Sequence, residues 1–366
     1  MSGLEALRLY AGPAALRWIR ARGLQPGDIR TIAGAAGGPK GLILGPLDRW
    51  LFGQWLAQSD QPVDLVGASI GAWRMATACL DDCVSAFERL EHDYIRQDHA
   101  LAPGQSRPTP DQVSELFGSN LQAFYGARAG EVLSHPRYRL HVVTARGRHL
   151  LGREHRLRTP IGYLGAFLTN TVHRKAMGAW LERVVFSTPG TDLPFVATDY
   201  RTRQVALSAD NFHSALQASC SIPFMLRAVH DIAGAPPGAY WDGGITDYHL
   251  HLNYAGVDAM ADATPGLVLY PHFQQAVVPG WLDKSLKWRH KPTHFLDNLL
   301  LLAPSPEWVL KLPNAKLPDR NDFLHYGRDL PGRVRVWSAA ASASRQLADE
   351  FARWVDAPDP QWVHPL

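Results

Sequence analysis

An α/β fold with largely parallel strands is the architecture that this sequence predicts. In the first third of the chain, short apolar runs typical of buried strands alternate with amphipathic stretches of helical spacing. Parallel strands joined by helices leave this pattern in a sequence. Glycine-rich turns follow two of the strand-like runs, at 34–41 and at 67–71, where a strand would pass directly into a helix.

The elements expected in this part are a helix, two strand–turn–helix units and a further group of helices. Residues 4–22 place apolar side chains near one helical face, although Pro13 is able to split that helix. The helices between 84 and 130 are separated by a proline-rich loop, 102–110, which is a candidate lid. The two units are expected at 30–34 with 42–57, and at 63–66 with 70–80.

The rest of the chain is expected to add elements to the same domain. The expected strands are 139–144, 183–186, 194–197, 266–270 and 333–337, and the expected helices are 161–181, 211–221 and 341–355. Because no repeat and no linker is present, we expect a single domain over 1–366. The motif-bearing part would span 29–250, with 255–366 as an extension of it.

Composition limits the classes of function. With 46% apolar and 19% charged residues, the chain of 366 residues should fold as a globular protein, and a net charge of +3 without a basic block argues against nucleic-acid binding. Neither a signal peptide nor a run of about 18 apolar residues is present. Cys79 and Cys83, four apart in an expected helix, and Cys220 lack metal-ligand spacing. We therefore expect a cytoplasmic protein without a metal or cofactor.

The twelve tryptophans are the most unusual feature of the composition, and many stand beside Arg or Lys, as Trp18 and Trp288 do. Most of them should pack in the core or at its rim. Amphipathic aromatic side chains also suit a lipid–water interface, so peripheral contact with a membrane surface is an expected interaction. Charged residues outside the motifs, such as Lys175, Arg183 and Arg201, are expected at the surface.

The segment Gly67-Ala68-Ser69-Ile70-Gly71 matches Gly-x-Ser-x-Gly, and no other segment of the chain does. The strand expected before it and the helix expected after it are what a nucleophile elbow requires. Glycines on both sides let neighbouring backbone pass close by, and the hydroxyl of Ser69 would project at the positive end of the helix. The alternative is a tight turn in which the serine only caps the helix.

A nucleophilic serine needs a general base, and Asp242 is the candidate. Because Gly243 and Gly244 follow it, little side-chain bulk surrounds the carboxylate and backbone N–H groups are able to hold it. Asp247, five residues on, could support Asp242 or lie at the surface. An Asp-Gly-Gly sequence by itself is also an ordinary turn. Asp242 is therefore a candidate base only because Ser69 is a candidate nucleophile.

The glycine-rich turn at 34–41 is the candidate oxyanion hole, because its amides should point towards the end of the sheet. It lacks the Gly-Lys-Ser/Thr of a P-loop and the spacing of a dinucleotide fingerprint. The N–H groups of Gly37 and Gly38 are the expected donors, and Lys40 should orient the loop or meet an anionic head group. Gly41 and Ile70 complete the expected oxyanion and substrate-binding set.

In this order, the three motifs resemble those of the patatin-like phospholipase family. That family has a glycine-rich loop ending in Arg/Lys-Gly, then Gly-x-Ser-x-Gly, then a distant Asp-Gly-Gly/Ala. It also has an Ala/Ser-rich helix that ends in a proline and an aromatic residue, which is similar to residues 218–224 here. The resemblance covers about residues 29–250. The family's loop usually begins Asp-Gly-Gly-Gly, whose first two positions are Ala35 and Ala36 here, and the family's arginine is Lys40.

The resemblance implies a Ser69–Asp242 dyad without histidine, on a three-layer α/β/α sheet with a nucleophile elbow. The glycines of the loop would be the oxyanion donors. The implied activity is that of a serine esterase or phospholipase A-type hydrolase, which degrades lipids by cleaving fatty acyl esters of phospholipids or other acyl lipids through an acyl-enzyme.

Two other interpretations stay open. In the first, the chain is an α/β-hydrolase with a Ser–His–Asp triad, for which the candidate histidines are His249, His251, His272 and His290. In the second, it is a non-catalytic lipid-binding protein that has the same fold.

Overall fold

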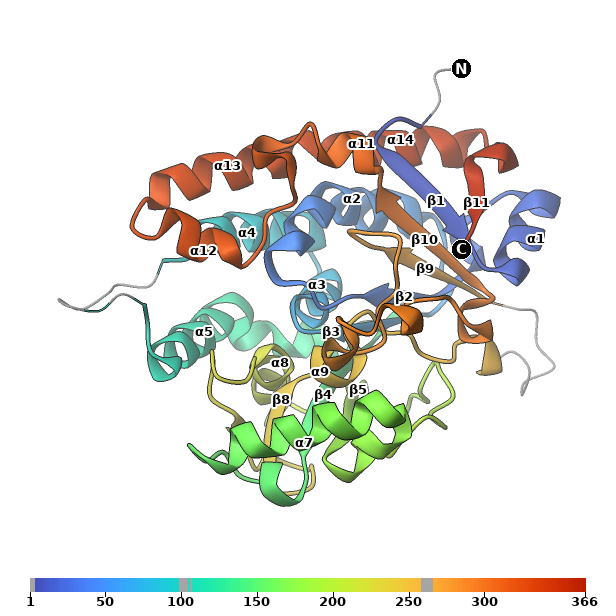
Figure 1. The fold of residues 1–366 in the computed structure, drawn as a ribbon. Helices are drawn as coiled ribbons and strands as arrows, with labels where there is room; N and C mark the ends of the chain where they lie inside the picture. The colour runs from blue at the N-terminus through green and yellow to red at the C-terminus, as the bar shows by residue number, and fades with distance from the viewer. Residues whose placement is uncertain (1–3, 99–104, 106, 258–265) are drawn as a thin grey trace.

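The computed structural model describes residues 4–98, 105, 107–257 and 266–366, and shows an α/β protein (Figure 1). In the described part, eleven strands form one mixed, mostly parallel sheet that is flanked by helices. The strands are β1 (Leu7–Ala11), β2 (Ile29–Gly34), β3 (Val63–Ala68), β4 (Tyr138–Gly147), β5 (Leu181–Ser187), β6 (Thr202–Ala206), β7 (Val229–His230), β8 (Ala239–Asp242), β9 (Leu267–Pro271), β10 (Leu299–Pro304) and β11 (Val363–Pro365). Their order is β11-β1-β10-β9-β2-β3-β4-β5-β6, with β8 also paired to β4, and β7 to β8.

Helices cover the sheet, and Figure 1 shows α7 on the side of the molecule opposite to α13 and α14. The helices are α1 (Pro13–Arg22), α2 (Gly45–Trp50), α3 (Ile70–Ala78), α4 (Cys83–Arg96), α5 (Pro110–Tyr125), α6 (Ala129–Leu133), α7 (Arg158–Val172), α8 (Phe212–Cys220), α9 (Gly244–Asp247), α11 (Pro306–Val309), α12 (Asn321–Tyr326), α13 (Leu330–Ala343) and α14 (Arg345–Asp356). Short 3₁₀ segments adjoin them, including η2 (Gly38–Leu44), η6 (His149–Leu151), η8 (Trp281–Asp283) and η9 (Lys287–Arg289).

Strands from both ends of the chain interleave in the sheet. β9 and β10 lie between β2 and β1, and β11 adds to the outer edge of β1. β3 and β10 are buried along their whole length, which explains why both are almost continuously apolar in the sequence. Residues 267–365 therefore contribute three strands to the same sheet as the motif-bearing part.

The expected strand–turn–helix units are confirmed. β2 and β3 are each followed by helical segments, and the second expected helix of the pair begins at Ile70 as α3. The helical segment after β2 runs from Gly38 to Gln58 and combines 3₁₀, α and π turns. The expected strand at 266–270 is β9. Residues 102–104 and 106 of the candidate lid lie outside the described part, and its last residue begins α5.

The expected helix over 4–22 is wrong in its first half. Residues Leu7–Ala11 form β1, whose side chains alternate between buried and half-buried, and Pro13 then takes the first position of α1. The sequence analysis missed this alternation with period two because the same apolar residues also fit one face of a helix.

Three other expectations are corrected. The expected strand at 333–337 lies inside α13, where Arg333 and Trp337 are one turn apart and both buried. Residues 194–197 form no strand, and only Val196 makes a single bridge, to Asn253. Cys79 follows α3 while Cys83 begins α4, so the two cysteines do not share a helix.

Candidate active site

Ser69 lies at the tight turn between the end of β3 and the start of α3. Its φ of 56° is in the left-handed region, which residues other than glycine rarely adopt. Gly71 has to be a glycine, because a Cβ there would collide with the carbonyl of Gly34 at the end of β2. A Cβ on Gly67 would collide with the backbone of Ala72. The turn is therefore strained, and its glycines leave the backbone around Ser69 closely packed.

β4 is the strand that brings Ser69 and Asp242 together. β3 pairs with β4 as far as Ala68 opposite Val143, and β8 pairs with β4 from Asp242 opposite Thr144. Since β5 occupies the other edge of β4, β3 and β8 share one edge and their carboxyl ends meet. The hydroxyl of Ser69 donates a 2.7 Å hydrogen bond to Oδ2 of Asp242, and both residues are buried.

The second oxygen of the Asp242 carboxylate is held by the turn that follows it. Oδ1 accepts a 2.7 Å hydrogen bond from the backbone N–H of Gly244. A Cβ on Gly244 would lie 2.9 Å from that same oxygen, and one on Gly243 would collide with the carbonyl of Val143. The two glycines thus allow the backbone to approach the carboxylate and β4 closely.

Burial raises the pKa of Asp242 above its ordinary value of 3.8. The positive charge of Arg320 opposes this rise, as do the hydrogen bonds from Ser69 and Gly244 and the charge of Lys284. A carboxylate with a raised pKa is a stronger base, and this one is already hydrogen-bonded to a hydroxyl. The pair can therefore move the serine proton onto Asp242 when the oxygen attacks an electrophile.

The glycine-rich loop after β2 contacts residues that follow each member of this pair in the sequence. The side chain of Ala36 packs against Gly244, where a Cβ would lie 2.7 Å from it. Further along, Gly41 lies against Ile70, the residue that follows Ser69. The loop is therefore next to the hydroxyl and the carboxylate, as an oxyanion-binding segment has to be.

The other predicted residues of the loop lie beside an aromatic ring from the C-terminal third of the chain. The ring of Phe273 packs where a Cβ of Gly37 would stand, and Nζ of Lys40 lies 5.2 Å from the centre of that ring. Gly38 has a φ of 57° and opens η2. The assignment of Gly37 and Gly38 as N–H donors to an oxyanion stays a prediction.

The segment at the end of α8 forms hydrogen bonds with the backbone of both Ser69 and Asp242, which sequence reasoning did not predict. The hydroxyl of Ser219 accepts a 3.0 Å hydrogen bond from the N–H of Ser69 and donates a 2.7 Å bond to the carbonyl of Val143. The carbonyl of Ser221 accepts a 2.9 Å bond from the N–H of Asp242. The only signal was that both serines stand in the motif at 218–224.

A group of three cations, Lys40, Lys284 and Arg320, adjoins the dyad, and the two that act on the carboxylate of Asp242 come from the part of the chain without motifs. Lys284 and Arg320 both interact electrostatically with Asp242, and Lys284 interacts with Lys40 as well. Burial, followed by repulsion from Arg320 and Lys40, lowers the pKa of Lys284 to about 8. Nζ of Lys284 lies 4.0 Å from the ring centre of Tyr248. Among the described residues, no carboxylate forms an ion pair with any of the three cations.

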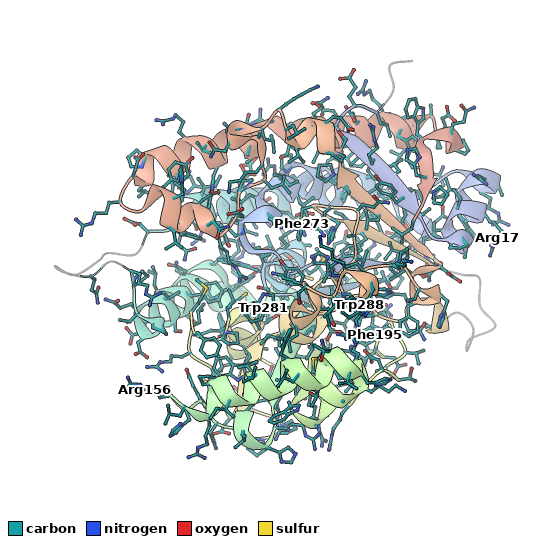
Figure 2. The ribbon with its side chains drawn as sticks, viewed as in Figure 1. Arg17, Arg156, Phe195, Phe273, Trp281 and Trp288 are labelled. Carbon is teal, nitrogen blue, oxygen red and sulfur yellow. The ribbon has the colours of Figure 1, made fainter. Side chains whose placement is uncertain are left out.

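Residues of the glycine-rich loop line two cavities. The one beside Asp242 has an empty volume of about 240 Å³ and is lined by Ala36, Ile222, Pro223, Asp242, Gly244, Ile245, Tyr248, Trp281 and Arg320. In Figure 2, Trp281 lies just above α7, towards the centre of the molecule. The cavity therefore joins the carboxylate, a cation and aromatic side chains.

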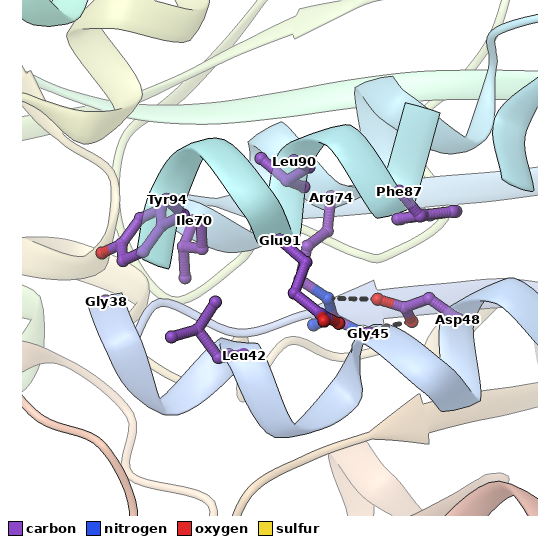
Figure 3. Close-up of a pocket in the computed structure, with 11 residues that line it drawn as sticks. Gly38, Leu42, Gly45, Asp48, Ile70, Arg74, Phe87, Leu90, Glu91 and Tyr94 are labelled. Carbon is purple, nitrogen blue, oxygen red and sulfur yellow. Dashed lines mark hydrogen bonds and ion pairs between the residues drawn. The ribbon is translucent and has the colours of Figure 1, made fainter. Parts of the chain in front are cut away.

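The second cavity begins beside the Ser69 turn and has an empty volume of about 340 Å³. Figure 3 shows its largely apolar wall and the pair of Arg74 and Asp48 that lies at one end. Two hydrogen bonds of 2.7 Å join these two buried side chains. Its lining includes Gly38, Gly41, Leu42, Ile70, Phe87, Leu90, Glu91 and Tyr94. The wall of this cavity beside Ile70 is therefore apolar.

The four candidate histidines of a triad form their hydrogen bonds with groups other than Ser69 and Asp242. His249 and His272 are buried with their rings 4.4 Å apart, and Nδ1 of each bonds to backbone of residues 274–278. His251 bonds to Thr293, and His290 bonds to the carbonyl of Asp283. Burial lowers the pKa of His249 and lowers that of His272 to about 3. Within the described residues, no hydrogen bond joins a histidine to Ser69 or Asp242.

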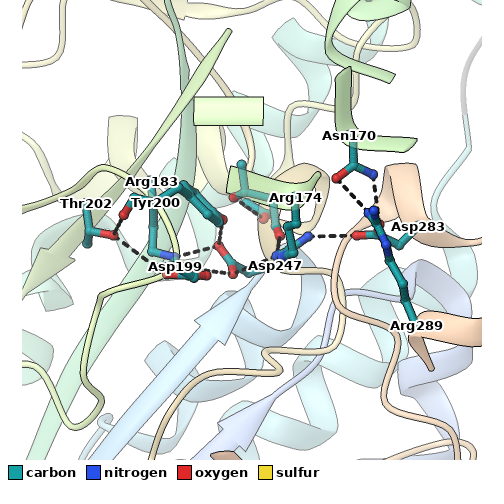
Figure 4. A network of polar contacts seen from close by, with 11 residues as sticks. Asn170, Arg174, Arg183, Asp199, Tyr200, Thr202, Asp247, Asp283 and Arg289 are labelled. Atoms are coloured by element: carbon teal, nitrogen blue, oxygen red, sulfur yellow. Dashed lines mark hydrogen bonds and ion pairs between the residues drawn. The ribbon is translucent and has the colours of Figure 1, made fainter. Parts of the chain in front are cut away.

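The sequence analysis expected Arg183 at the surface, but this side chain lies in a buried polar network that includes Asp247. It forms ion pairs with Asp247 at 2.6 Å and with Asp199 at 2.8 Å, and Tyr200 donates to Asp247. Figure 4 shows how Arg174 continues the network to Asp283, Asn170 and Arg289. Asp247 therefore supports α9, the helix that follows Asp242, instead of lying at the surface.

No family model matches the sequence, and no curated protein sequence matches it significantly. Across the described residues, no helix has both the length and the apolar character needed to cross a lipid bilayer. Nor does that part of the chain group three histidine, cysteine or acidic side chains as metal ligands would be grouped.

Proposed function

We propose that this protein is a serine lipid acyl hydrolase that cleaves fatty acyl esters through a Ser69–Asp242 dyad. The observation that carries the proposal is the 2.7 Å hydrogen bond between a serine at a strained strand–helix turn and a buried carboxylate. The predicted patatin-like architecture, a three-layer α/β/α sheet with a nucleophile elbow, belongs to this proposal. The absence of a family match leaves the site geometry and the motif order as its support.

The reaction follows from the two side chains. Asp242 accepts the proton of Ser69 as the serine oxygen forms a bond to the ester carbonyl carbon, and the bond to the alcohol oxygen then breaks. Asp242 returns that proton to the departing alcohol. In the second half, Asp242 takes a proton from the water that attacks the acyl carbonyl carbon, the bond to the Ser69 oxygen breaks, and Asp242 returns the proton to that oxygen as the fatty acid leaves. Backbone N–H groups of the loop, with Gly37 and Gly38 as donors, stabilise the negative oxygen in both halves.

The substrate follows from the two cavities. The apolar cavity that Ile70 and Leu42 line would accept the acyl chain, and the cavity with Asp242 and Arg320 would accept the alcohol part. Lys40, Lys284 and Arg320 favour an alcohol part that carries negative charge, as the head group of a phospholipid does.

Replacing Ser69 tests the proposal directly. We expect Ser69→Ala and Asp242→Asn each to lower kcat on p-nitrophenyl acyl esters by at least about a thousandfold, because each removes one half of the proton transfer. A fluorophosphonate probe should label Ser69 in the wild-type protein and label neither variant at a comparable rate. Ser344→Ala, which changes a buried serine between α13 and α14, is the matched control and should keep full activity. Undiminished turnover by Ser69→Ala would rule the dyad out.

The two alternatives give different results in the same assays. A triad would lose orders of magnitude in kcat when His249, His251, His272 or His290 is replaced by alanine, whereas a dyad would lose little beyond a stability effect. A non-catalytic lipid-binding protein would bind a fatty acyl ligand but would not react with the fluorophosphonate.

A further inference from the structure

Helix α7 has the opposite amphipathicity to that of an ordinary surface helix. Its buried face consists of small, polar or amphipathic side chains, namely Thr159, Gly162, Tyr163, Ala166 and Asn170. Its solvent face is large and apolar, with exposed fractions between 55% and 84%. The residues of that face are Leu157, Ile161, Leu164, Leu168 and Val172. Their spacing of three or four residues forms a continuous stripe along the helix.

Other exposed apolar side chains adjoin this stripe. Phe224 and Met225 are half exposed, and the ring of Phe224 contacts Tyr163 of α7. Trp288 is 65% exposed in η9, where the neighbouring Arg289 donates to the carbonyl of Thr171 at the end of α7. More than half of the exposed large apolar side chains in the described residues belong to this one surface, which is more than an isolated exposed residue would explain.

The charged side chains of the two segments that carry α7 and Trp288 all have one sign. The sequence from 155 to 181 contains no Asp or Glu, and neither does the sequence from 284 to 296. The exposed cations of these two segments form no ion pair with any carboxylate of the described chain. They are Arg156, Arg158, Lys175, Lys284, Lys287 and Lys291. Figure 2 places Arg156 at the beginning of α7. An apolar stripe with a basic rim is complementary to a lipid bilayer that contains anionic lipids.

The surface adjoins the site of the proposed function. Tyr163 packs against Trp241, the residue before Asp242, and against Phe224, which follows Pro223 in the wall of the Asp242 cavity. On the other side, Asn170 of α7 bonds to Asp283 in the network that supports α9. The contacts of α7 therefore hold its apolar face outward and beside the cavity in which we place the alcohol part of the ester.

We infer that α7, together with Phe224, Met225 and Trp288, docks the protein on the surface of a bilayer that carries anionic lipids. The apolar stripe would enter the boundary between head groups and acyl chains, and the basic rim would lie among the anionic head groups. This inference deepens the proposed function, on which it rests, because it names the surface through which a lipid ester would reach Asp242.

Vesicle binding tests the docking surface without turnover when every protein carries Ser69→Ala. We expect this protein to co-sediment with vesicles of phosphatidylcholine that contain about one third phosphatidylglycerol, and more weakly with pure phosphatidylcholine. Adding Leu164→Glu and Leu168→Glu should weaken binding about tenfold or more, because two apolar contacts are replaced by repelled charges. Leu310→Glu with Leu324→Glu, two leucines outside the surface that are even more exposed, is the matched control and should leave binding unchanged.

The results separate failure of the docking surface from failure of the proposed function. Equal vesicle binding by the two leucine pairs would overturn the docking surface even where Ser69 is shown to hydrolyse soluble esters. A concentration-dependent dimer that the α7 pair abolishes, without vesicle binding, would also overturn it, since the face would then join two copies of the chain. Vesicle binding as expected, but no hydrolysis by the wild-type protein, would uphold the surface and reject the esterase. With Ser69 intact, the α7 pair should keep wild-type turnover of p-nitrophenyl acetate, which shows that it folds.

Discussion

At the scale of single residues, the Asp242 carboxyl group combines opposing influences. Burial favours its protonated form, while the charges of Arg320 and Lys284 favour the carboxylate. Catalysis by the dyad requires the carboxylate, so activity should fall as the pH falls through the pKa of Asp242. The same raised pKa means that ionisation of this group opposes folding, an opposition that is present at neutral pH and is relieved as the pH falls through the folded-state pKa.

Arg320→Gln should raise the pKa of Asp242 further, because it removes the strongest of the influences that lower it. We therefore expect the acidic limb of the profile of kcat/KM against pH to move to higher pH. Lys284→Gln should move it in the same direction by less, and Arg320→Lys should leave it near the wild-type position. The measurement is the pH profile on a neutral soluble ester, so that charge on the substrate does not contribute. An acidic limb that stays in place in Arg320→Gln would contradict this account.

At the scale of elements, the dyad is positioned where the carboxyl ends of β3 and β8 meet along β4. Ser219 joins Ser69 to β4 there by hydrogen bonds. Ser219→Ala would leave the N–H of Ser69 without its side-chain acceptor and the carbonyl of Val143 without its donor. We expect a loss of stability of about 1–3 kcal/mol and a fall in kcat of roughly ten- to a hundredfold with little change in KM. Steady-state kinetics and urea unfolding measure both effects.

The control for that variant is Ser221→Ala, because the hydroxyl of Ser221 donates to the carbonyl of Gln217 within the adjacent helix. Its loss should leave the rate of fluorophosphonate labelling at Ser69 nearly unchanged. If Ser219→Ala is labelled as fast as Ser221→Ala, Ser219 does not position the nucleophile.

These elements can be predicted from the sequence only where the residues that determine them stand close together in the chain. β3 and α3 are predictable because a buried apolar strand, a Gly-x-Ser-x-Gly turn and a helix stand next to one another. β8 has four residues and is defined by its pairing with β4, 94 to 98 residues earlier in the chain, so its short sequence carries no period. The error at 333–337 has the converse cause, since alternating Arg and Val imitate a strand that the packing of α13 overrides.

The same distinction applies to the candidate site. Ser69, Asp242 and the loop glycines stand in short motifs, so their types and order are visible in the sequence. Lys284 and Arg320 reach Asp242 from irregular segments far along the chain, where no pattern distinguishes them from surface cations. Arg183 is buried only because two aspartates from other segments neutralise it, and composition alone cannot indicate that partnership.

At the scale of the whole molecule, the two ends of the chain depend on each other. β1 is held between β10 and β11, which come from the last part of the chain. The buried carboxylate of Glu350 in α14 accepts hydrogen bonds of 2.8–3.1 Å from the N–H groups of Ala6 and Leu7 at the start of β1. Since β10 also pairs with β9, which adjoins β2, the placement of the N-terminal strand extends to the strands around the site.

Replacing Glu350 should therefore weaken the whole fold without changing the chemistry. Glu350→Ala leaves two buried N–H groups unpaired, and we expect a loss of roughly 2–4 kcal/mol in the free energy of unfolding, measured as a lower urea midpoint. Asp349→Ala, on the exposed side of the same helix, should change it by no more than about 0.5 kcal/mol. Below the transition, kcat of Glu350→Ala should equal that of the wild-type protein, because no contact joins Glu350 to the dyad in the described residues. Equal midpoints for the two variants would show that this junction does not stabilise the sheet.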